Sequence, residues 1–151
     1  MLPTTVDRVR QNTCAEWNAR IQRQTEENVA AYARRGGAAI DRRLAELDAE
    51  WDIERTLEAN AATAVLVGVT LSTLDRRFLV LPAAVAGFLL QHALQGWCPP
   101  LGLFRRLGVR TATEIDQERI ALKALRGDFR EIDGGFNQSM DAATLLAAAQ
   151  R

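Results

Sequence analysis

The centre of the chain holds two apolar runs with only a short charged turn between them, and this arrangement limits the fold more than any other feature. Residues 61–74 carry hydroxyl groups as their only polar side chains, and a hydroxyl can bond a carbonyl of its own helix. Residues 78–90 carry no polar side chain at all, and the turn between the runs is Asp75-Arg76-Arg77. The sequence therefore predicts two apolar helices in antiparallel contact.

The length and the flanks of the two runs bear on whether this hairpin lies in a bilayer or in a soluble core. Each run is at or below the roughly 17 to 25 residues that a spanning helix needs, so length allows both. The turn arginines argue against insertion, although arginines at a helix end can reach the headgroups. The residues that follow the second run favour a membrane, because tryptophan and arginine are typical of the membrane–water interface. These residues are Trp97, Arg105, Arg106 and Arg110.

Small residues recur at a spacing of four in both runs. In lipid, such residues let two helix backbones approach closely, which is a main source of helix association. The abundance of alanine explains the same pattern equally well. The predicted helix-packing residues are Ala64, Gly68, Ala83 and Gly87.

Two motifs follow the hairpin, namely Gly96-Trp97-Cys98-Pro99 and Leu107-Gly108-Val109-Arg110-Thr111. With the hairpin, they resemble the YgaP-like inner-membrane domain, a small bacterial family with two transmembrane helices, over about residues 60–111. The resemblance implies an inner-membrane location. Members of this family occur alone or fused to a rhodanese sulfurtransferase, and the domain's own role is largely unassigned. We expect no rhodanese domain here, because no part of the sequence alternates strands and helices.

The residues before the hairpin predict two amphipathic helices. The first begins near Thr4 or Thr5 and ends at Gly36-Gly37, and the second runs from residue 38 to about 74, continuously or with a kink. The second helix carries a stripe at spacings of four, three and four that is typical of a coiled-coil seam. Because polar residues interrupt the facing surface of the first helix, we expect a second copy of the chain to cover this stripe, which comprises Ile40, Leu44, Leu47 and Trp51.

The residues after the hairpin predict a short helix over 101–107 and a longer one over 112–126. Thr111 and Glu114 form a capping-box pattern at the start of the longer helix. Residues 128–138 look flexible, and residues 141–150 could form a weak helix. The expected organisation is an N-terminal amphipathic region (1–58), the membrane hairpin with its Gly-Trp-Cys-Pro turn (59–111), and a C-terminal helix with a tail (112–151).

Cys98 is the one residue with a case for chemical reactivity. It precedes two prolines and a predicted helix start, whose dipole would stabilise a thiolate. The simpler interpretation is an inert buried thiol, because most buried cysteines are unreactive. His92, with Gln91 and Gln95, is expected to form structural hydrogen bonds rather than a pathway or an oligomer interior. The sequence predicts no metal-ligand cluster, no catalytic site and no cofactor site, and the single histidine rules out most such sites.

Charge and cysteine content narrow the function. The net charge is zero, so we expect no nucleic-acid partner. Cys14 and Cys98 lie in unlike settings and predict no disulfide. We therefore expect an all-α, non-catalytic bacterial inner-membrane protein that self-associates or binds an unknown protein partner, with both termini in the cytoplasm. The alternatives are a membrane-surface thiol or persulfide carrier that uses Cys98, and a soluble helical bundle.

Overall fold

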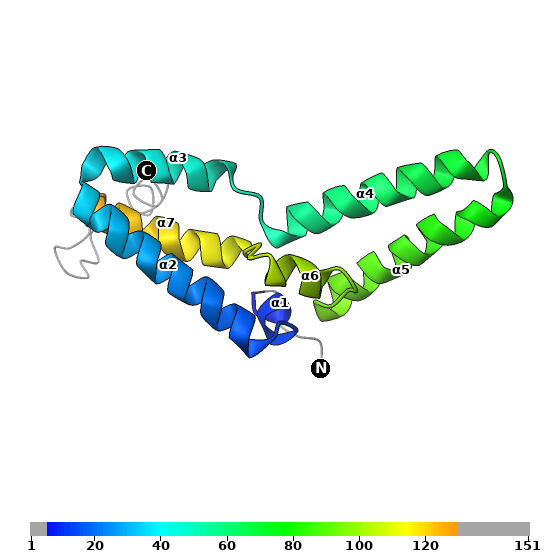
Figure 1. The fold of residues 1–151 in the computed structure, drawn as a ribbon, viewed down its shortest axis with the longest axis horizontal. Helices are drawn as coiled ribbons and strands as arrows, with labels where there is room; N and C mark the ends of the chain where they lie inside the picture. The colour runs from blue at the N-terminus through cyan, green and yellow to red at the C-terminus, as the bar shows by residue number, and fades with distance from the viewer. Residues whose placement is uncertain (1–5, 130–151) are drawn as a thin grey trace, which may run out of the picture. The chain divides into compact units, whose positions relative to one another are not determined.

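The computed structural model describes residues 6–129, and every regular element in this part of the chain is helical. The all-α prediction is confirmed (Figure 1). The predicted helix over 141–150 and most of the predicted flexible segment 128–138 lie outside the described residues. The elements are α1 (Arg8–Gln11), α2 (Ala15–Arg35), α3 (Gly37–Ala49), α4 (Ile53–Ser72), the 3-10 helix η1 (Arg76–Leu79), α5 (Val80–Gln95), α6 (Leu101–Arg106) and α7 (Ala112–Arg126).

The helices belong to two compact units, and each unit combines two separate stretches of sequence. The first unit comprises Met1–Gln24 and Trp51–Ile115, and the second comprises Thr25–Glu50 and Asp116–Arg151. These units differ from the three consecutive regions that the sequence suggested. The hairpin therefore belongs to the same unit as α1.

The N-terminal helix is interrupted, so the prediction of one long helix is wrong. The break lies between α1 and α2, where side chains bond the backbone groups that a continuous helix would use. The Thr13 hydroxyl donates to the Val9 carbonyl at 2.7 Å. The Asn12 amide donates to the Arg8 carbonyl and, across the unit, to the Gln95 carbonyl, both at 2.8 Å. The predicted stop at Gly36 is confirmed, because Gly36 has a φ of 82° and separates α2 from α3.

A second break separates α3 from α4, so residues 38–74 do not form one continuous helix. The chain is extended at Glu50, and Asp52 caps α4 by accepting a hydrogen bond from the Arg55 backbone N–H at 2.8 Å. The Ile53 N–H donates to the Arg110 carbonyl, also at 2.8 Å. Backbone donors at the start of α4 are thus satisfied by groups outside a helical ladder, which stabilises a separate helix start.

Helices α4 and α5 run antiparallel and contact each other, with η1 at the tip (Figure 1). Gly68 is buried in this contact, where an added Cβ would lie 2.6 Å from Cδ of Pro82. Ala64 lines a pocket between the helices. Ala83 and Gly87 are exposed, and a Cβ on Gly87 would meet nothing within 4 Å. Only the two predicted packing residues of α4 therefore serve the contact within the hairpin.

The core of the first unit lies where the hairpin meets α1 and α6. Its buried members are Val9, Ile53, Leu57, Cys98 and Leu101, with Phe104 and Val109 packed against them. This cluster brings together three segments that are far apart in the sequence. It fixes the end of the hairpin opposite the tip.

The predicted self-association stripe is mostly buried in the second unit. Ile40, Leu44 and Leu47 are 4%, 7% and 1% exposed, so these three residues offer no surface to a second copy. Trp51 lies outside α3, half exposed, with the Arg55 guanidinium 4.3 Å from its ring. The prediction that a second copy covers this stripe is therefore wrong for its three aliphatic members, because the chain buries them itself.

A buried carboxylate joins the helical segments of the second unit. Glu118 on α7 is fully buried and accepts hydrogen bonds from Arg43 of α3, the shorter at 2.7 Å. Asn28 of α2 donates to the same carboxylate at 3.4 Å. Burial is the largest single effect and opposes the shift, but the hydrogen bonds that Arg43 donates to Glu118 and Glu46 outweigh it and raise the pKa of Arg43. One charged group on α7 thus contacts both other helical segments.

Candidate functional site

The end of the hairpin opposite the tip contains the C-terminal end of α5, at Gly96. Gly96 has a φ of 75° and its N–H donates to the His92 carbonyl at 2.7 Å, which closes α5. A Cβ on Gly96 would lie 2.6 Å from backbone atoms of Arg8. Glycine is therefore required twice, for the left-handed conformation and for the close approach of α1.

A chain of charged side chains crosses this end of the hairpin. The Arg8 guanidinium donates to Glu54 Oε1 at 2.8 Å, and Glu54 Oε2 lies 2.9 Å from His92 Nε2. His92 is only 3% exposed. The hydrogen bond with His92, together with that from Arg8, lowers the pKa of Glu54 to about 2 against the opposing effect of burial. His92 thus forms hydrogen bonds inside the chain, as expected from its position in an apolar helix.

Cys98 lies next to this chain and is 4% exposed. Its side chain interacts with the His92 ring. The remaining ring nitrogen, Nδ1, is buried and has no closely aligned hydrogen-bond partner among the described residues. Sequence reasoning found no partner for Cys98, because the turn at Gly96 brings the thiol back toward a histidine six positions earlier. The glycine that ends an apolar helix was the available signal.

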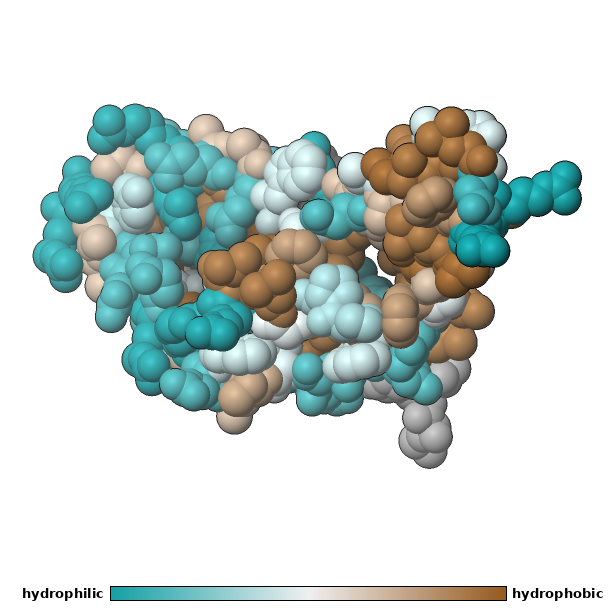
Figure 2. All heavy atoms as spheres, turned by 45° about the vertical axis from the view of Figure 1, so that its right-hand side comes forward, coloured by the Kyte–Doolittle hydropathy of each residue, from teal (hydrophilic) through white to brown (hydrophobic). Residues whose placement is uncertain are grey.

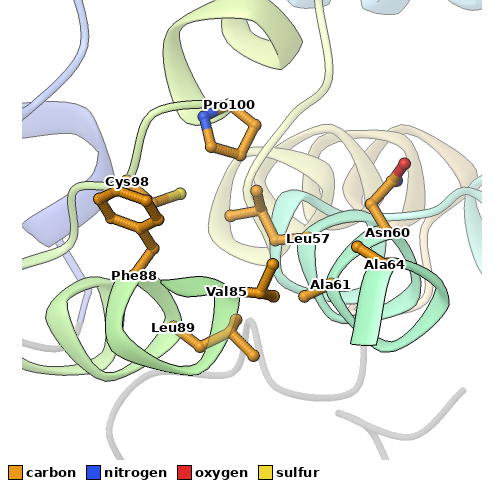
Figure 3. A pocket seen from close by; sticks show the side chains of 9 residues that line it. All are labelled: Leu57, Asn60, Ala61, Ala64, Val85, Phe88, Leu89, Cys98 and Pro100. Atoms are coloured by element: carbon orange, nitrogen blue, oxygen red, sulfur yellow. The ribbon is translucent and has the colours of Figure 1, made fainter. Parts of the chain in front are cut away.

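The thiol also borders an apolar pocket of about 160 Å³ between α4 and α5. Figure 3 shows the Cys98 sulfur pointing in among the side chains of Phe88, Leu57 and Pro100. Apart from the thiol, Asn60 supplies the one polar side chain of the lining, and its amide already donates to the Thr56 carbonyl at 2.7 Å. The full lining is Leu57, Asn60, Ala61, Ala64, Val85, Phe88, Leu89, Cys98 and Pro100.

A buried ion pair lies farther along the same unit. Arg105 is fully buried and donates to both oxygens of Glu114, at 2.6 and 2.8 Å. The predicted capping box is confirmed, because Glu114 accepts from the Thr111 N–H at 2.8 Å and the Thr111 hydroxyl accepts from the Glu114 N–H at 3.2 Å. Burial would raise the pKa of Glu114, but the hydrogen bonds from Arg105 and Thr111 outweigh it and lower the pKa.

This pair corrects the prediction that three arginines after the hairpin face a membrane surface. Arg105 and Arg110 are 0% and 7% exposed, so neither reaches solvent or headgroups. Arg106 alone of the three is exposed. Trp97, by contrast, is 41% exposed beside the end of α5, where an interfacial residue was expected.

The hairpin carries most of the exposed apolar surface of its unit. Figure 2 shows hydrophobic residues gathered over it. The helical segment Arg76–Gln95 has a mean hydropathy of 1.6 over a window of which 6% is buried, and it is the one helix in the described part of the chain that is long and apolar enough to cross a membrane. Exposed large residues of the hairpin include Leu66, Val67, Val69, Leu74, Phe78, Leu79, Val80, Leu81, Phe88, Leu90 and Leu94.

Comparisons with known proteins add no relative: no family model, curated protein or solved structure matches the chain. Among the described residues, no group of three or more His, Cys, Asp or Glu side chains could hold a metal ion.

Proposed function

We propose that this chain is a small non-catalytic protein of a bacterial inner membrane, whose hairpin of α4, η1 and α5 inserts into the bilayer. Its remaining helices would then stay at the membrane surface and bind a partner or a second copy of the chain. The proposal also relates the chain to the YgaP-like membrane domain, because its Gly96-Trp97-Cys98-Pro99 motif resembles the motif of that family.

The observation that supports this proposal is the exposure of the most apolar helix. A helix of such composition in a water-soluble protein forms the core and is buried, yet 6% of the apolar window in Arg76–Gln95 is buried. Contiguous apolar surface of this kind marks contact with a membrane or with another protein. The segment has 20 residues, which at about 1.5 Å per residue give roughly 30 Å, the thickness of a bilayer's hydrocarbon core.

Helix α4 would insert into the membrane together with α5 rather than independently of it. Its first turns carry Glu54, Arg55 and Glu58, so the apolar part begins near Ala59. The hydroxyls of Thr63 and Thr70 donate to carbonyls of their own helix at 2.8 Å, which satisfies them without water. Close packing at Gly68 supplies the association between the two helices.

The distribution of arginines supports an orientation with both termini in the cytoplasm. Insertion is decided before the chain folds, so an arginine counts whether or not it is later buried in an ion pair. The positive-inside rule counts basic residues near the ends of the membrane segments and gives acidic residues little weight. Two arginines lie in the tip, Arg76 and Arg77, whereas more flank the hairpin, namely Arg42, Arg43, Arg55, Arg105, Arg106 and Arg110.

The surface that a second copy would contact is the exposed face of α5, because the stripe of α3 is buried. Ala83 and Gly87 lie one turn apart on α5, both exposed. Small residues at this spacing permit close helix contact in lipid. A partner helix would be accommodated here without displacing any side chain of the monomer.

Membrane insertion can be tested with a matched pair of substitutions. Ala86, in the middle of the apolar segment, and Ala124, on α7, are both exposed. Ala86→Arg should lower the fraction of protein that resists carbonate extraction, because arginine at the centre of a spanning helix costs about 2.5–3.5 kcal/mol on insertion scales. Ala124→Arg should leave that fraction unchanged. Wild-type protein released by carbonate and monodisperse without detergent would refute insertion and favour the soluble bundle.

Orientation can be read from thiol labelling in spheroplasts. Cys14 is exposed, so it reports the side on which the N-terminal helices lie. A membrane-impermeant maleimide should leave Cys14 unlabelled until the membrane is opened, and should label Asp75→Cys at the tip. Labelling of Cys14 in intact spheroplasts would contradict the proposed orientation.

A further inference from the structure

Cys98 lies beside a pocket and beside a histidine that is bonded to a carboxylate, and a structural cysteine needs neither. It borders the apolar pocket between α4 and α5, its side chain interacts with His92, and His92 is bonded to Glu54. A nucleophile beside a histidine that a carboxylate orients is the recurring arrangement of activated thiols. The Nδ1 of His92 is buried and has no closely aligned hydrogen-bond partner among the described residues, so it is the ring nitrogen that can share a proton with the thiol.

The pocket restricts the chemistry of any reagent that reaches the sulfur. Its lining is apolar except for the thiol and Asn60, so charged or strongly polar reagents would have to lose their hydration there. Its volume of about 160 Å³ is close to that of an engineered cavity of about 150 Å³ in another protein, which stays dry and takes benzene. A short apolar group therefore fits next to the sulfur.

The surroundings of the pocket indicate where such a group comes from. The pocket is half open and is flanked by the exposed apolar faces of α4 and α5. Trp97, adjacent to Cys98 and half exposed, is the type of residue that lies at a membrane–water interface. A molecule with a long apolar tail and a reactive carbonyl at its polar end matches this placement, with its tail continuing into lipid.

We propose that Cys98 is an acyl-accepting thiol that takes the acyl chain of a fatty acyl thioester, with His92 as its general base and Glu54 as the group that orients His92. His92 holds the proton of the thiol, and the Cys98 sulfur attacks the carbonyl carbon of the thioester as a thiolate. The bond from that carbon to the donor's sulfur breaks, and the departing thiolate takes the proton from His92. The products are S-acyl Cys98 and the free donor thiol, without any oxidant or reductant.

This inference rests on the proposed function, because the acyl tail is supplied from the bilayer in which the hairpin lies. The other cysteine provides an internal comparison. Cys14 is exposed on the surface and belongs to neither the pocket nor the charged chain. Both thiols are free, so their acylation can be followed in one sample.

The test uses the full-length protein in mild detergent with palmitoyl-coenzyme A, and intact-mass and peptide analysis report acylation that hydroxylamine reverses. Cys98 should acylate at least tenfold faster than Cys14, while a charged methanethiosulfonate should show the opposite preference. His92→Gln should slow acylation of Cys98 by about 100-fold, because a positioned general base typically contributes at least that much. The rate at Cys14 should not change.

A second, matched pair tests the pocket without touching the thiol or His92. Ala61 lines the pocket and its neighbour Ala62 is exposed. Ala61→Leu should fill the pocket and slow acylation of Cys98, whereas Ala62→Leu should not. If His92→Gln fails to fold, as circular dichroism would show, the two leucine variants still decide the outcome.

Two results would overturn the proposal: Cys98 acylating no faster than Cys14, or Ala61→Leu and Ala62→Leu acylating at the same rate. The result is separable from membrane insertion. A carbonate-soluble protein that acylates Cys98 would refute insertion alone, and an inserted protein with an unreactive Cys98 would refute the thiol site alone.

Discussion

Removing one member of the Arg105–Glu114 pair should destabilise the first unit more than any exposed substitution. Arg105 and Glu114 are 0% and 4% exposed, so each single substitution leaves an opposite charge buried without this partner, and for Glu114 the remaining cation is Arg10, whose Nε lies 3.8 Å from Oε1. Arg105 also donates to the Val109 carbonyl at 3.0 Å and to Asn18 Oδ1 at 2.8 Å. Breaking a buried pair in this way typically costs about 3–5 kcal/mol, and we expect Arg105→Met to lie in that range.

The companion variants separate charge from shape. Glu114→Gln keeps an oxygen that can accept from the Thr111 N–H and so retains part of the capping box. The double variant Arg105→Met with Glu114→Gln removes both charges, so it should lose less free energy of unfolding than the two single losses added together, by about 1–3 kcal/mol. Arg106→Met is the control, since Arg106 is exposed and should change stability by at most about 0.5 kcal/mol.

The assay is urea unfolding in mild detergent, followed by the fluorescence of Trp17. This ring lies beside α6, 3.7 Å from where a Cβ on Gly102 would be. Replacing Trp51 and Trp97 by phenylalanine leaves Trp17 as the sole tryptophan reporter. If the losses of the single variants add within about 0.5 kcal/mol in the double variant, the two groups do not act as a pair and the reasoning is refuted.

Three further predictions concern other parts of the chain. Gly96→Ala should destabilise the first unit, by about 1–2 kcal/mol for the left-handed conformation alone and more for the contact with Arg8, whereas Gly87→Ala, with open space around it, should not; thermal unfolding compares them. Because the pKa of Glu54 is lowered from 4.5 to about 2, its contribution to stability should be complete above pH 4.5 and lost as the pH falls toward 2; an acid transition of unchanged shape in Glu54→Gln would contradict this. Leu44→Asp with Leu47→Asp should unfold α3 and not separate a dimer, because both leucines are buried. Circular dichroism and the oligomeric state check this: helical signal should be lost, whereas a folded variant that dissociates would contradict it.

Signals that act within a few residues were sufficient to predict several elements. The glycine pair at 36–37, the capping box at Thr111 and Glu114, and the two apolar runs each determine structure through neighbouring residues. The prediction of an all-α fold followed from them. These features needed no knowledge of which segments meet.

The errors have a common physical origin, because each depends on a partner distant in the sequence. The interruption after Asn12 is stabilised by the Gln95 carbonyl, and the start of α4 by the Arg110 carbonyl. The sequence around Arg105 has the pattern of a basic flank and predicts a membrane-surface residue, whereas Asn18 and Glu114 bind its guanidinium in the fold. The contact between Cys98 and His92 does not follow from the sequence, because helical spacing does not predict which residues meet after a helix ends at a glycine in the left-handed conformation.

The interleaving of the two units has a consequence for synthesis of the protein. Val9 is in the core with Leu101, so Val9 leaves the ribosome 92 residues before the last fully buried member of this core. At about 5–20 residues per second, this interval is roughly 5–18 s. The hairpin emerges within it, and Gly96, against whose backbone Arg8 packs, follows directly. The first helix to be made is therefore among the last to reach its final position, and an early ribosomal product lacks the contacts that hold it.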